Sequence, residues 1–175
     1  KGRIKWFSNL NQSLDINPSN LFSSKPIVLY EDKLVVSTDL YLYVINSNTG
    51  STLSKTPISS LTKPLISKNN LFLITKDNLL VCLDVKTSEI LYSIDVNQSI
   101  ADFLNIKKKS ISIKTLALAN NGLLLFLINS YLVSFNSLGK IKNTVKLPSK
   151  PNSLPIFIND SIIYVDNQNK LIILN

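Results

Sequence analysis

The sequence predicts an all-β fold, and three observations support that prediction. Short apolar runs of about five residues, rich in Leu, Ile and Val, recur along the chain and are separated by polar turns. Asp, Asn and Gly recur in these turns, where they tolerate left-handed backbone angles. The groups of runs also repeat, because the Lys-Pro pair at Lys25 returns at Lys63, a step of 38 residues.

The stretch Leu71–Ile94 shows the pattern most clearly. Its apolar runs are Leu71–Thr75, Leu79–Leu83 and Ile90–Ile94. Lys76-Asp77-Asn78 separates the first two runs, and residues 84–89 separate the second from the third. Runs this short predict consecutive antiparallel strands rather than helices. A lone meander of such strands cannot bury both of its faces, so it needs copies of itself.

Four segments open the copies: Lys25–Val28, Lys63–Ile66, Lys114–Ala117 and Leu154–Phe157. A period near 38–40 residues with four short antiparallel strands per unit predicts a β-propeller in which each unit is one blade. A two-sheet sandwich is the alternative, but it does not account for the same turn chemistry at the same offset. We expect one partial propeller domain over residues 1–175, with a strand at 1–10, a polar linker at 11–24, blades at 25–61, 63–100 and 114–150, an insertion at 101–113 and an incomplete blade at 153–175.

Composition favours a folded domain. Of 175 residues, 45% are apolar and 17% are charged, which argues against disorder and gives enough apolar side chains for a core. The net charge is +8, from 19 Lys and Arg against 11 Asp and Glu. The lysines are mostly dispersed at turns and strand edges, which predicts a solvated surface rather than a binding stripe for nucleic acid, anionic lipid or an acidic partner. Since the chain starts at Lys1 and contains no Met, we expect a processed chain or a fragment.

The inventory of reactive side chains is small. The chain has no His and one Cys, Cys82, so it offers neither a Cys/His metal site nor an intrachain disulfide. Cys82 lies between Val81 and Leu83, which predicts a small buried apolar residue. The many Ser and Thr residues have no His nearby to activate them as nucleophiles. We therefore predict no catalytic, cofactor-binding or metal-binding residues and no enzymatic activity.

Three groups of residues are candidates for binding. The densest basic cluster is Lys107, Lys108 and Lys109 with Lys114 nearby, in or beside the insertion. These four lysines are candidates for meeting an acidic partner or a phosphate, but the pattern favours a solvated loop. Trp6 is expected to lock one blade to another, or else to anchor a partner. Tyr41 and Tyr43 share a strand face, which predicts packing between blades or a stacking platform for bases or sugars.

Two repeated motifs resemble a known family. The first is Val44-Ile45-Asn46-Ser47-Asn48-Thr49-Gly50, and the second runs from Cys82 through Asp84 and Ser88 to Tyr92. An apolar strand, an Asp or Asn, and a Thr-Gly or variant before the next strand resemble the pyrroloquinoline-quinone (PQQ)-like propeller repeat. Gly2 to Trp6 looks like the end of the same motif in a preceding blade. The WD-repeat family fits less well, because its Gly-His and Trp-Asp pairs are absent.

This resemblance implies two branches of function. Quinoprotein dehydrogenases hold a quinone and a calcium ion and need grouped carboxylates, whereas the acidic residues here lie mostly at turns. The other branch contains non-catalytic scaffolds, among them the family of the lipoprotein B subunit of the outer-membrane β-barrel assembly machinery. That branch implies a periplasmic or outer-membrane-associated, protein-binding scaffold without cofactors. Its partners would be other proteins, including envelope assembly factors, with a membrane link only through an anchor outside this chain.

Two other functions and two arrangements of the N-terminal strand stay open. One alternative is a ligand-binding or quinoprotein-type enzyme propeller whose site lies outside this fragment. The other is a basic nucleic-acid-associated domain, although no nucleic-acid partner is expected. The resembling family has about eight blades, so we expect part of a larger propeller. Strand 1–10 then belongs to a preceding blade, or it completes the fourth blade and closes a ring or links two chains as a homo-oligomer.

Overall fold

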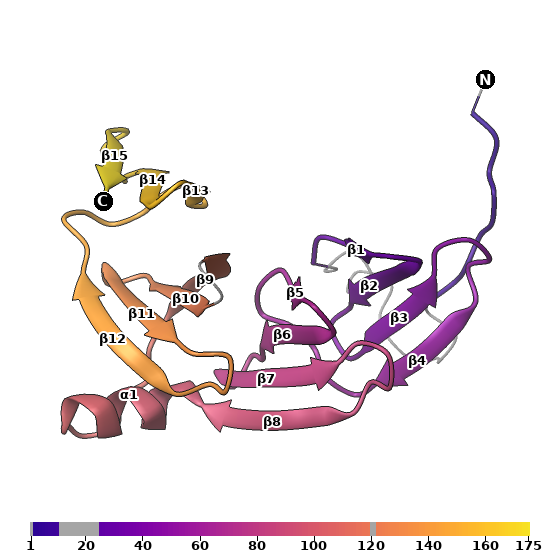
Figure 1. Cartoon of the computed structure of the whole chain (residues 1–175), viewed down its shortest axis with the longest axis horizontal. Helices are drawn as coiled ribbons and strands as arrows, with labels where there is room; N and C mark the ends of the chain where they lie inside the picture. Colours follow the sequence, from indigo (N-terminus) through magenta and orange to yellow (C-terminus); the bar gives the residue numbers. More distant parts are fainter. Residues whose placement is uncertain (1, 11–24, 120–121) are drawn as a thin grey trace. The chain divides into compact units, whose positions relative to one another are not determined.

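The computed structural model describes residues 2–10, 25–119 and 122–175, so the predicted linker at 11–24 lies outside the described residues. Within the described residues the strands form four antiparallel sheets, three with four strands and one with three, and a single helix interrupts them (Figure 1). This confirms the predicted all-β fold built from four-stranded blades. The chain divides into two compact units, Lys1–Ser93 and Ile94–Asn175.

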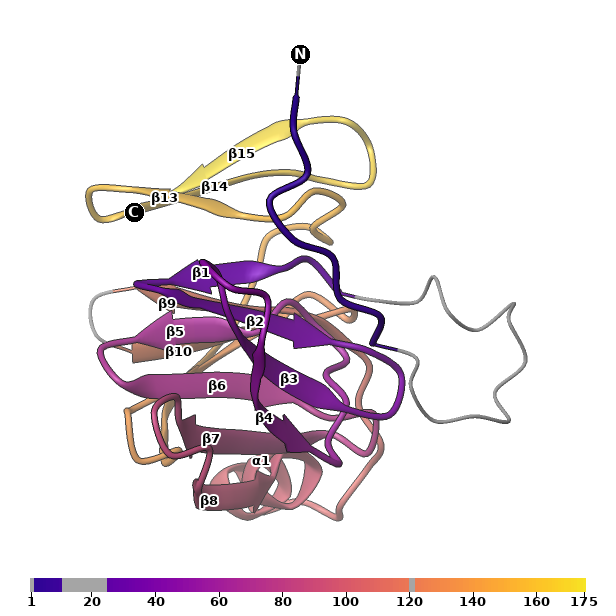
Figure 2. The ribbon, with the colours of Figure 1, turned by 90° about the vertical axis from the view of Figure 1, so that its right-hand side faces the viewer.

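The first unit contains two meanders, in each of which neighbouring strands pair in chain order (Figure 2). The strands of the first are β1 (Val28–Tyr30), β2 (Lys33–Ser37), β3 (Leu42–Asn46) and β4 (Thr52–Thr56), and those of the second are β5 (Leu65–Ser67), β6 (Asn70–Ile74), β7 (Leu79–Asp84) and β8 (Ile90–Asp95). The inner strands β2, β3, β6 and β7 carry most of the buried residues of this unit, because their side chains pack against the facing blade.

The second unit begins near the end of β8 and holds the helix and seven strands. Its elements are α1 (Val96–Leu104), β9 (Ile113–Ala119), β10 (Gly122–Leu127), β11 (Tyr131–Phe135), β12 (Ile141–Lys146), β13 (Ile156–Ile158), β14 (Ser161–Val165) and β15 (Leu171–Leu174). The helix was not expected from the sequence. It takes up residues 96–100 of the predicted 63–100 blade and the start of the predicted insertion, so both of those boundaries need correction.

Residues 2–9 form no strand, contrary to the strand predicted over residues 1–10. Their sequence alternates, but within the described chain they have no strand beside them to complete a ladder. Ile4 and Phe7 are 88% and 86% exposed. Trp6 is the contact that holds this segment: its indole N–H donates to the Ser47 carbonyl at 2.9 Å, and its ring lies against Gly50. Trp6 therefore holds this segment on the β1–β4 blade, a packing role that differs from the expected contact between two blades.

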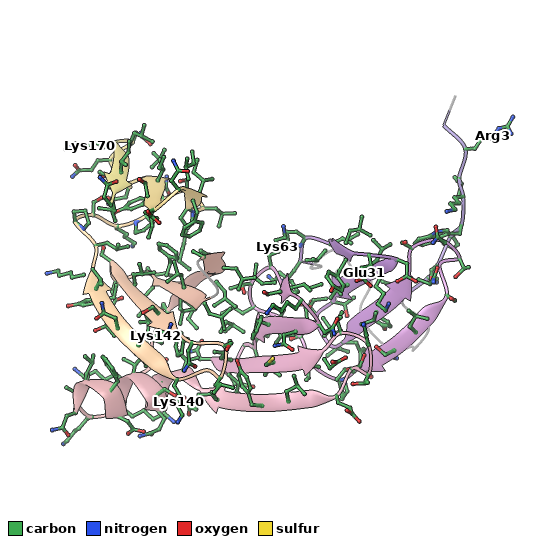
Figure 3. The ribbon with its side chains drawn as sticks, viewed as in Figure 1. Arg3, Glu31, Lys63, Lys140, Lys142 and Lys170 are labelled. Carbon is green, nitrogen blue, oxygen red and sulfur yellow. The ribbon has the colours of Figure 1, made fainter. Side chains whose placement is uncertain are left out.

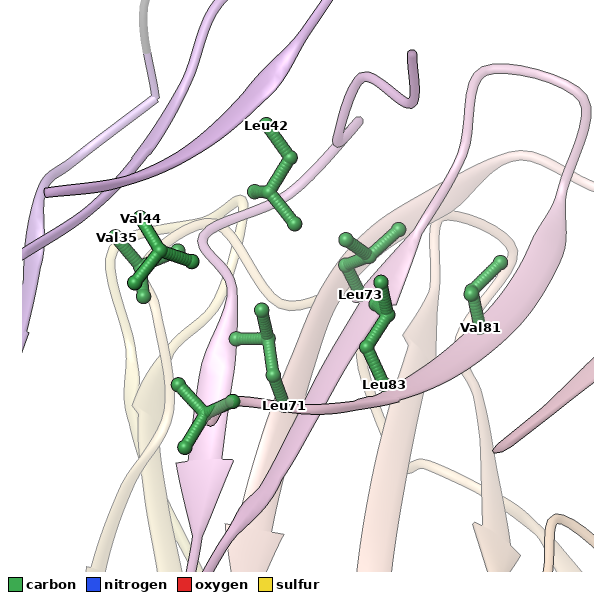
Figure 4. Close-up of a cluster of buried hydrophobic side chains, with 8 residues drawn as sticks. Val35, Leu42, Val44, Leu71, Leu73, Val81 and Leu83 are labelled. Atoms are coloured by element: carbon green, nitrogen blue, oxygen red, sulfur yellow. The ribbon is translucent and has the colours of Figure 1, made fainter. Parts of the chain in front are cut away.

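In each unit an apolar cluster lies between facing sheets. In the first unit Val35, Leu42 and Val44 of the β1–β4 blade meet residues of the β5–β8 blade, which are Leu71, Leu73, Val81, Leu83 and Val85 (Figure 4). In the second unit Phe126, Leu132 and Leu147 form a cluster on which Phe157, Ile162 and Leu174 of the β13–β15 sheet pack. Each blade thus buries a face against the next blade along the chain, which is how propeller blades stabilise one another.

The hairpin between the third and fourth strands repeats in chemical detail. Asn46, Asp84 and Asn136 each accept backbone N–H bonds on one side-chain oxygen from residues two to four positions later, at 2.7–3.0 Å. Such bonds stabilise a tight turn. They also lower the pKa of the Asp84 carboxyl, chiefly through the N–H groups of Thr87 and Lys86.

The residue that closes this hairpin has positive φ in every complete blade. Gly50 and Gly139 have φ of 75° and 76°, and Ser88 takes the same place with φ of 62°. Trp6 follows Gly2 by four residues, and Ser54 follows Gly50 by the same four. The contact between Trp6 and Gly50 is therefore repeated one blade later by Ser54 and Ser88, whose hydroxyl oxygens lie 2.5 Å apart. The aromatic–glycine pair has been replaced by a serine–serine hydrogen bond.

The β13–β15 sheet is incomplete on one edge and one face. Within the described chain β15 pairs with β14 and has no fourth strand beside it. Ile156, Ile163 and Ile173 stand in one cross-strand row on the face opposite the Phe157 side. Ile156 and Ile173 are 56% and 58% exposed, and Leu171 on the same face is 66% exposed. A contiguous apolar face of this kind is the surface that a further blade would cover.

We expect Ser88→Gly to be more stable than Ser88→Ala. Both variants remove the hydrogen bond to Ser54, but glycine adopts positive φ without a steric cost, whereas alanine does not. The difference in the free energy of unfolding should be about 1 kcal/mol, measured by urea denaturation. Ser54→Ala is the control that removes the hydrogen bond alone. Equal stabilities of the Gly and Ala variants would contradict the backbone argument.

We expect Ile156→Lys combined with Ile173→Lys to lower the exposure of apolar surface without unfolding the chain. Binding of the dye ANS and light scattering at high protein concentration should fall by about half, since the row of isoleucines is broken by two charges. Ile90→Lys combined with Leu138→Lys is the control, because those exposed residues are not part of this row. An equal fall in both double variants would show that the β13–β15 face is not special.

Candidate partner-binding site

The site begins with α1, the one helix among the described residues. Asp95 caps its first turn: the Asp95 carboxylate accepts the Gln98 N–H at 3.0 Å. Asn105 ends it in the left-handed conformation, with φ of 53°. Val96, Ile100 and Ala101 are buried, at the spacing of a helix with one apolar face. The helix lies beside β12, with its opposite face toward solvent (Figure 1).

The segment after the helix, residues 106–112, folds back, and beyond the bond that ends the helix it is tied by an ion pair and two hydrogen bonds. The Lys108 ammonium lies 2.5 Å from the Asp95 carboxylate, and the Ile111 N–H donates to the Asn97 side chain at 3.1 Å. The Ile128 N–H donates to the Ser112 carbonyl at 2.9 Å, which joins the segment to the end of β10. Lys108 and the Gln98 N–H together lower the pKa of Asp95. The loop is thus anchored to the first turn of the helix and to the sheet.

These anchors divide the three consecutive lysines. Lys108 forms an ion pair with Asp95, whereas its neighbours Lys107 and Lys109 line a cavity of about 790 Å³. Lys150 from the connection after β12 adds a third cation to the lining.

The rest of the lining is mostly apolar. The full set of lining residues is Asn97, Ile100, Ala101, Leu104, Ile106, Lys107, Lys109, Ser110, Ile111, Ser112, Leu127, Ile128, Asn129, Tyr131, Val133, Thr144 and Lys150. It contains no Asp and no Glu. Among the described residues, no carboxylate lies within ion-pair distance of Lys107, Lys109 or Lys150. The cavity therefore combines an apolar floor with positive charges that the chain itself does not neutralise.

The four lysines predicted from the sequence do not act as one group. Lys107, Lys108 and Lys109 share the segment after the helix, but Lys114 is in β9 and its ammonium donates to the Asn152 carbonyl at 2.9 Å. Sequence reasoning missed Lys150 and the apolar lining from α1 and β10. The apolar residues Leu104 and Ile106 in a segment predicted to be an inserted loop were a usable signal. Lys150 gave none, because only the fold brings it near Lys107.

The tyrosine pair is not an open stacking platform. Tyr41 and Tyr43 meet edge to face with ring centroids 6.1 Å apart, and the Lys55 ammonium lies 3.9 Å from the centre of the Tyr41 ring. The Tyr43 hydroxyl donates to the Leu10 carbonyl at 3.0 Å. Tyr43 is also buried in a cluster to which Trp6 contributes. These contacts favour the packing role of the pair over base or sugar stacking.

Cys82 is buried, as predicted, with 1% of its surface exposed. Burial raises the pKa of its thiol to about 11, so it stays protonated at neutral pH and is a poor nucleophile. Among the described residues, no three His, Cys, Asp or Glu side chains group in a way that would hold a metal ion. No helix in the described part of the chain has the length and apolar character needed to cross a membrane.

Comparison with known proteins supports the fold. No family model matches the sequence, and neither does any curated protein. Among solved structures, BamB from Moraxella catarrhalis superposes with a TM-score of 0.68 at 13% identity, over 85% of this chain and 42% of BamB. The computationally designed Ika8 protein gives 0.62 at 14% identity, over 84% of this chain and 44% of Ika8. The designed Ika4 protein gives 0.65 at 15% identity, over 93% of this chain and 94% of Ika4.

These likenesses confirm the fold class. At sequence identities of 13–15%, they support a conclusion about the fold alone. The chain spans less than half the length of BamB and of Ika8, whereas it matches Ika4 over nearly the whole of both chains. BamB is the neighbour that agrees with the resemblance found in the sequence motifs. The repeat pattern and the structural comparison therefore point to the same architecture by independent routes.

We expect Asp95→Ala to lower the free energy of unfolding by about 1 kcal/mol at pH 7, because it removes the helix cap. Asp95→Asn should cost less, since asparagine also caps helices, although it does not pair with Lys108.

The charge of Asp95 should make the stability depend on pH. The pKa of Asp95 is lowered in the folded chain, so its negative charge stabilises the fold at pH values above its ordinary pKa near 3.8. That contribution is lost as the pH falls through the folded-state pKa. Chemical denaturation between pH 7 and pH 2 measures this, and a pH-independent difference between wild type and Asp95→Asn would contradict it.

Proposed function

We propose that this chain is a section of a non-catalytic β-propeller scaffold that binds other polypeptides. The observation that carries the proposal is the cavity beside α1, with its apolar floor and its unneutralised Lys107, Lys109 and Lys150. It lies where the chain departs from the blade repeat. Inserted loops on a rigid repeat scaffold are common places for binding, because the scaffold fixes their position.

Exposed apolar side chains on the insertion support the same proposal. Phe103, Leu104 and Ile106 are each between 43% and 53% exposed, and all three follow one another closely in the chain. Keeping such residues in water is unfavourable, and clusters of them with a polar rim are typical of protein-binding surfaces. Because three anchors hold residues 106–112 in place, binding there would require little ordering of the loop.

The proposal extends to the cell envelope. We propose a periplasmic or outer-membrane-associated scaffold that takes part in outer-membrane protein assembly, with envelope assembly factors as partners. The likeness to BamB and the PQQ-like repeat motifs are what support this part. A basic nucleic-acid-associated domain is the second candidate, which the net charge of +8 favours.

Photo-crosslinking in cells that produce the protein tests the proposal. A benzoylphenylalanine at Ser110, which lines the cavity, should yield crosslinks to a distinct set of polypeptides in the full-length protein. The same probe at Lys142, in β12 and outside the cavity lining, is the control. Crosslinks at Ser110 to nucleic acid that disappear at high salt would favour the second candidate. Identical products from both positions would contradict a binding site at the cavity.

A further inference from the structure

We propose that the cavity beside α1 binds an acidic polypeptide segment that carries apolar side chains between its carboxylates. This inference rests on the proposed function and specifies the partner of the same site. Three features of the described residues lead to it: the charge of the lining, its apolar floor and the fixed geometry of the loop. Each of them restricts the chemistry of the occupant.

The charge selects an anion. Lys107, Lys109 and Lys150 line the cavity, and the lining contains no carboxylate. Asp95, the carboxylate that contacts this loop, is already paired with Lys108. An occupant with carboxylates would neutralise the three free cations, whereas a basic occupant would be repelled by them.

The floor selects an occupant with apolar groups. Ile100, Ala101, Leu127 and Val133 are buried, and Leu104 and Ile106 are partly exposed around them. A cavity of about 790 Å³ has room for more than one side chain. A purely ionic ligand would leave this apolar surface unused, so the preferred ligand carries both kinds of group.

The same lining argues against single-stranded nucleic acid. Such sites combine a basic groove with aromatic rings on which successive bases stack. Tyr131 is the one aromatic residue of this lining, and aliphatic side chains make up the rest of its apolar part. The cavity therefore lacks a row of stacking surfaces and suits Leu, Ile or Phe side chains better than bases.

Fluorescence anisotropy with defined probes tests the inference. The probe is a fluorescein-labelled peptide of sequence Glu-Leu-Glu-Phe-Leu-Glu, compared with one in which Lys replaces each Glu and one in which Ser replaces each apolar residue. We expect the first peptide to bind the full chain at least tenfold more tightly than either of the others. Tighter binding of a labelled oligothymidylate, or equal affinity for all three peptides, would overturn the inference.

Matched variants locate the binding. Lys107→Glu with Lys109→Glu should weaken binding of the acidic peptide about tenfold, because two attractive charges become repulsive. Lys140→Glu with Lys142→Glu changes the net charge equally at the same sequence spacing. Lys142 lies in β12 and Lys140 directly before it (Figure 3), neither lysine lines the cavity, and this pair should leave the affinity within about twofold. Equal losses from both pairs would mean that the peptide responds to net charge and not to the cavity.

A second pair of variants tests the apolar floor. Leu104 lines the cavity and its neighbour Phe103 does not, while both are similarly exposed. We expect Leu104→Ser to weaken binding about fivefold and Phe103→Ser to leave it unchanged, with unaltered unfolding curves as the check on folding. If crosslinks to polypeptides form at Ser110 but the acidic peptide does not bind, the occupant is wrong and the scaffold function stands. If neither occurs, both fail.

Discussion

The fold depends on one constraint: a blade of four short strands has two apolar faces and cannot bury either alone. In the first unit Val35, Leu42 and Val44 reach almost complete burial because Leu71 and Leu83 of the next blade meet them. Burying one such side chain contributes about 1.5–3 kcal/mol, so a blade without its neighbour would lose most of its core. The exposed row on the β13–β15 sheet is the same kind of face without that cover.

The hairpin turns set the geometry that makes this packing regular. Asn46, Asp84 and Asn136 build the same turn, so the residue that closes it arrives at the same place with positive φ in each complete blade. What packs on that residue has changed between blades. The partly buried ring of Trp6 packs on Gly50, whereas Ser54 contacts Ser88 through a hydrogen bond between their hydroxyl groups. The two solutions keep the register of the turn, although the serine version retains a side chain at an unfavourable backbone angle.

The repeat and its turns were predictable from the sequence because they depend on local chemistry that recurs. The helix was not, because Asp95 both ends β8 and caps α1, so the strand pattern runs into the helix without a break. For residues 2–9 the error was the opposite one, because a strand was predicted and none formed. Their sequence is strand-like, but a strand needs a neighbouring strand to pair with. Local pattern predicts what a segment is able to form, and tertiary pairing decides whether it does.

The lysine triplet illustrates the same limit at the candidate site. In the sequence Lys107, Lys108 and Lys109 are one run of charge, and their equivalence is the natural expectation. The fold breaks that equivalence, since the ion pair from Lys108 to Asp95 stabilises the first turn of α1 and leaves its two neighbours on the side of the cavity. One lysine thus holds the loop in the position that gives the other two a shared surface with Lys150. An insertion between two blades needs contacts of its own to hold its conformation. Here the ion pair between Lys108 and Asp95 provides one, and it also places the loop that lines the cavity.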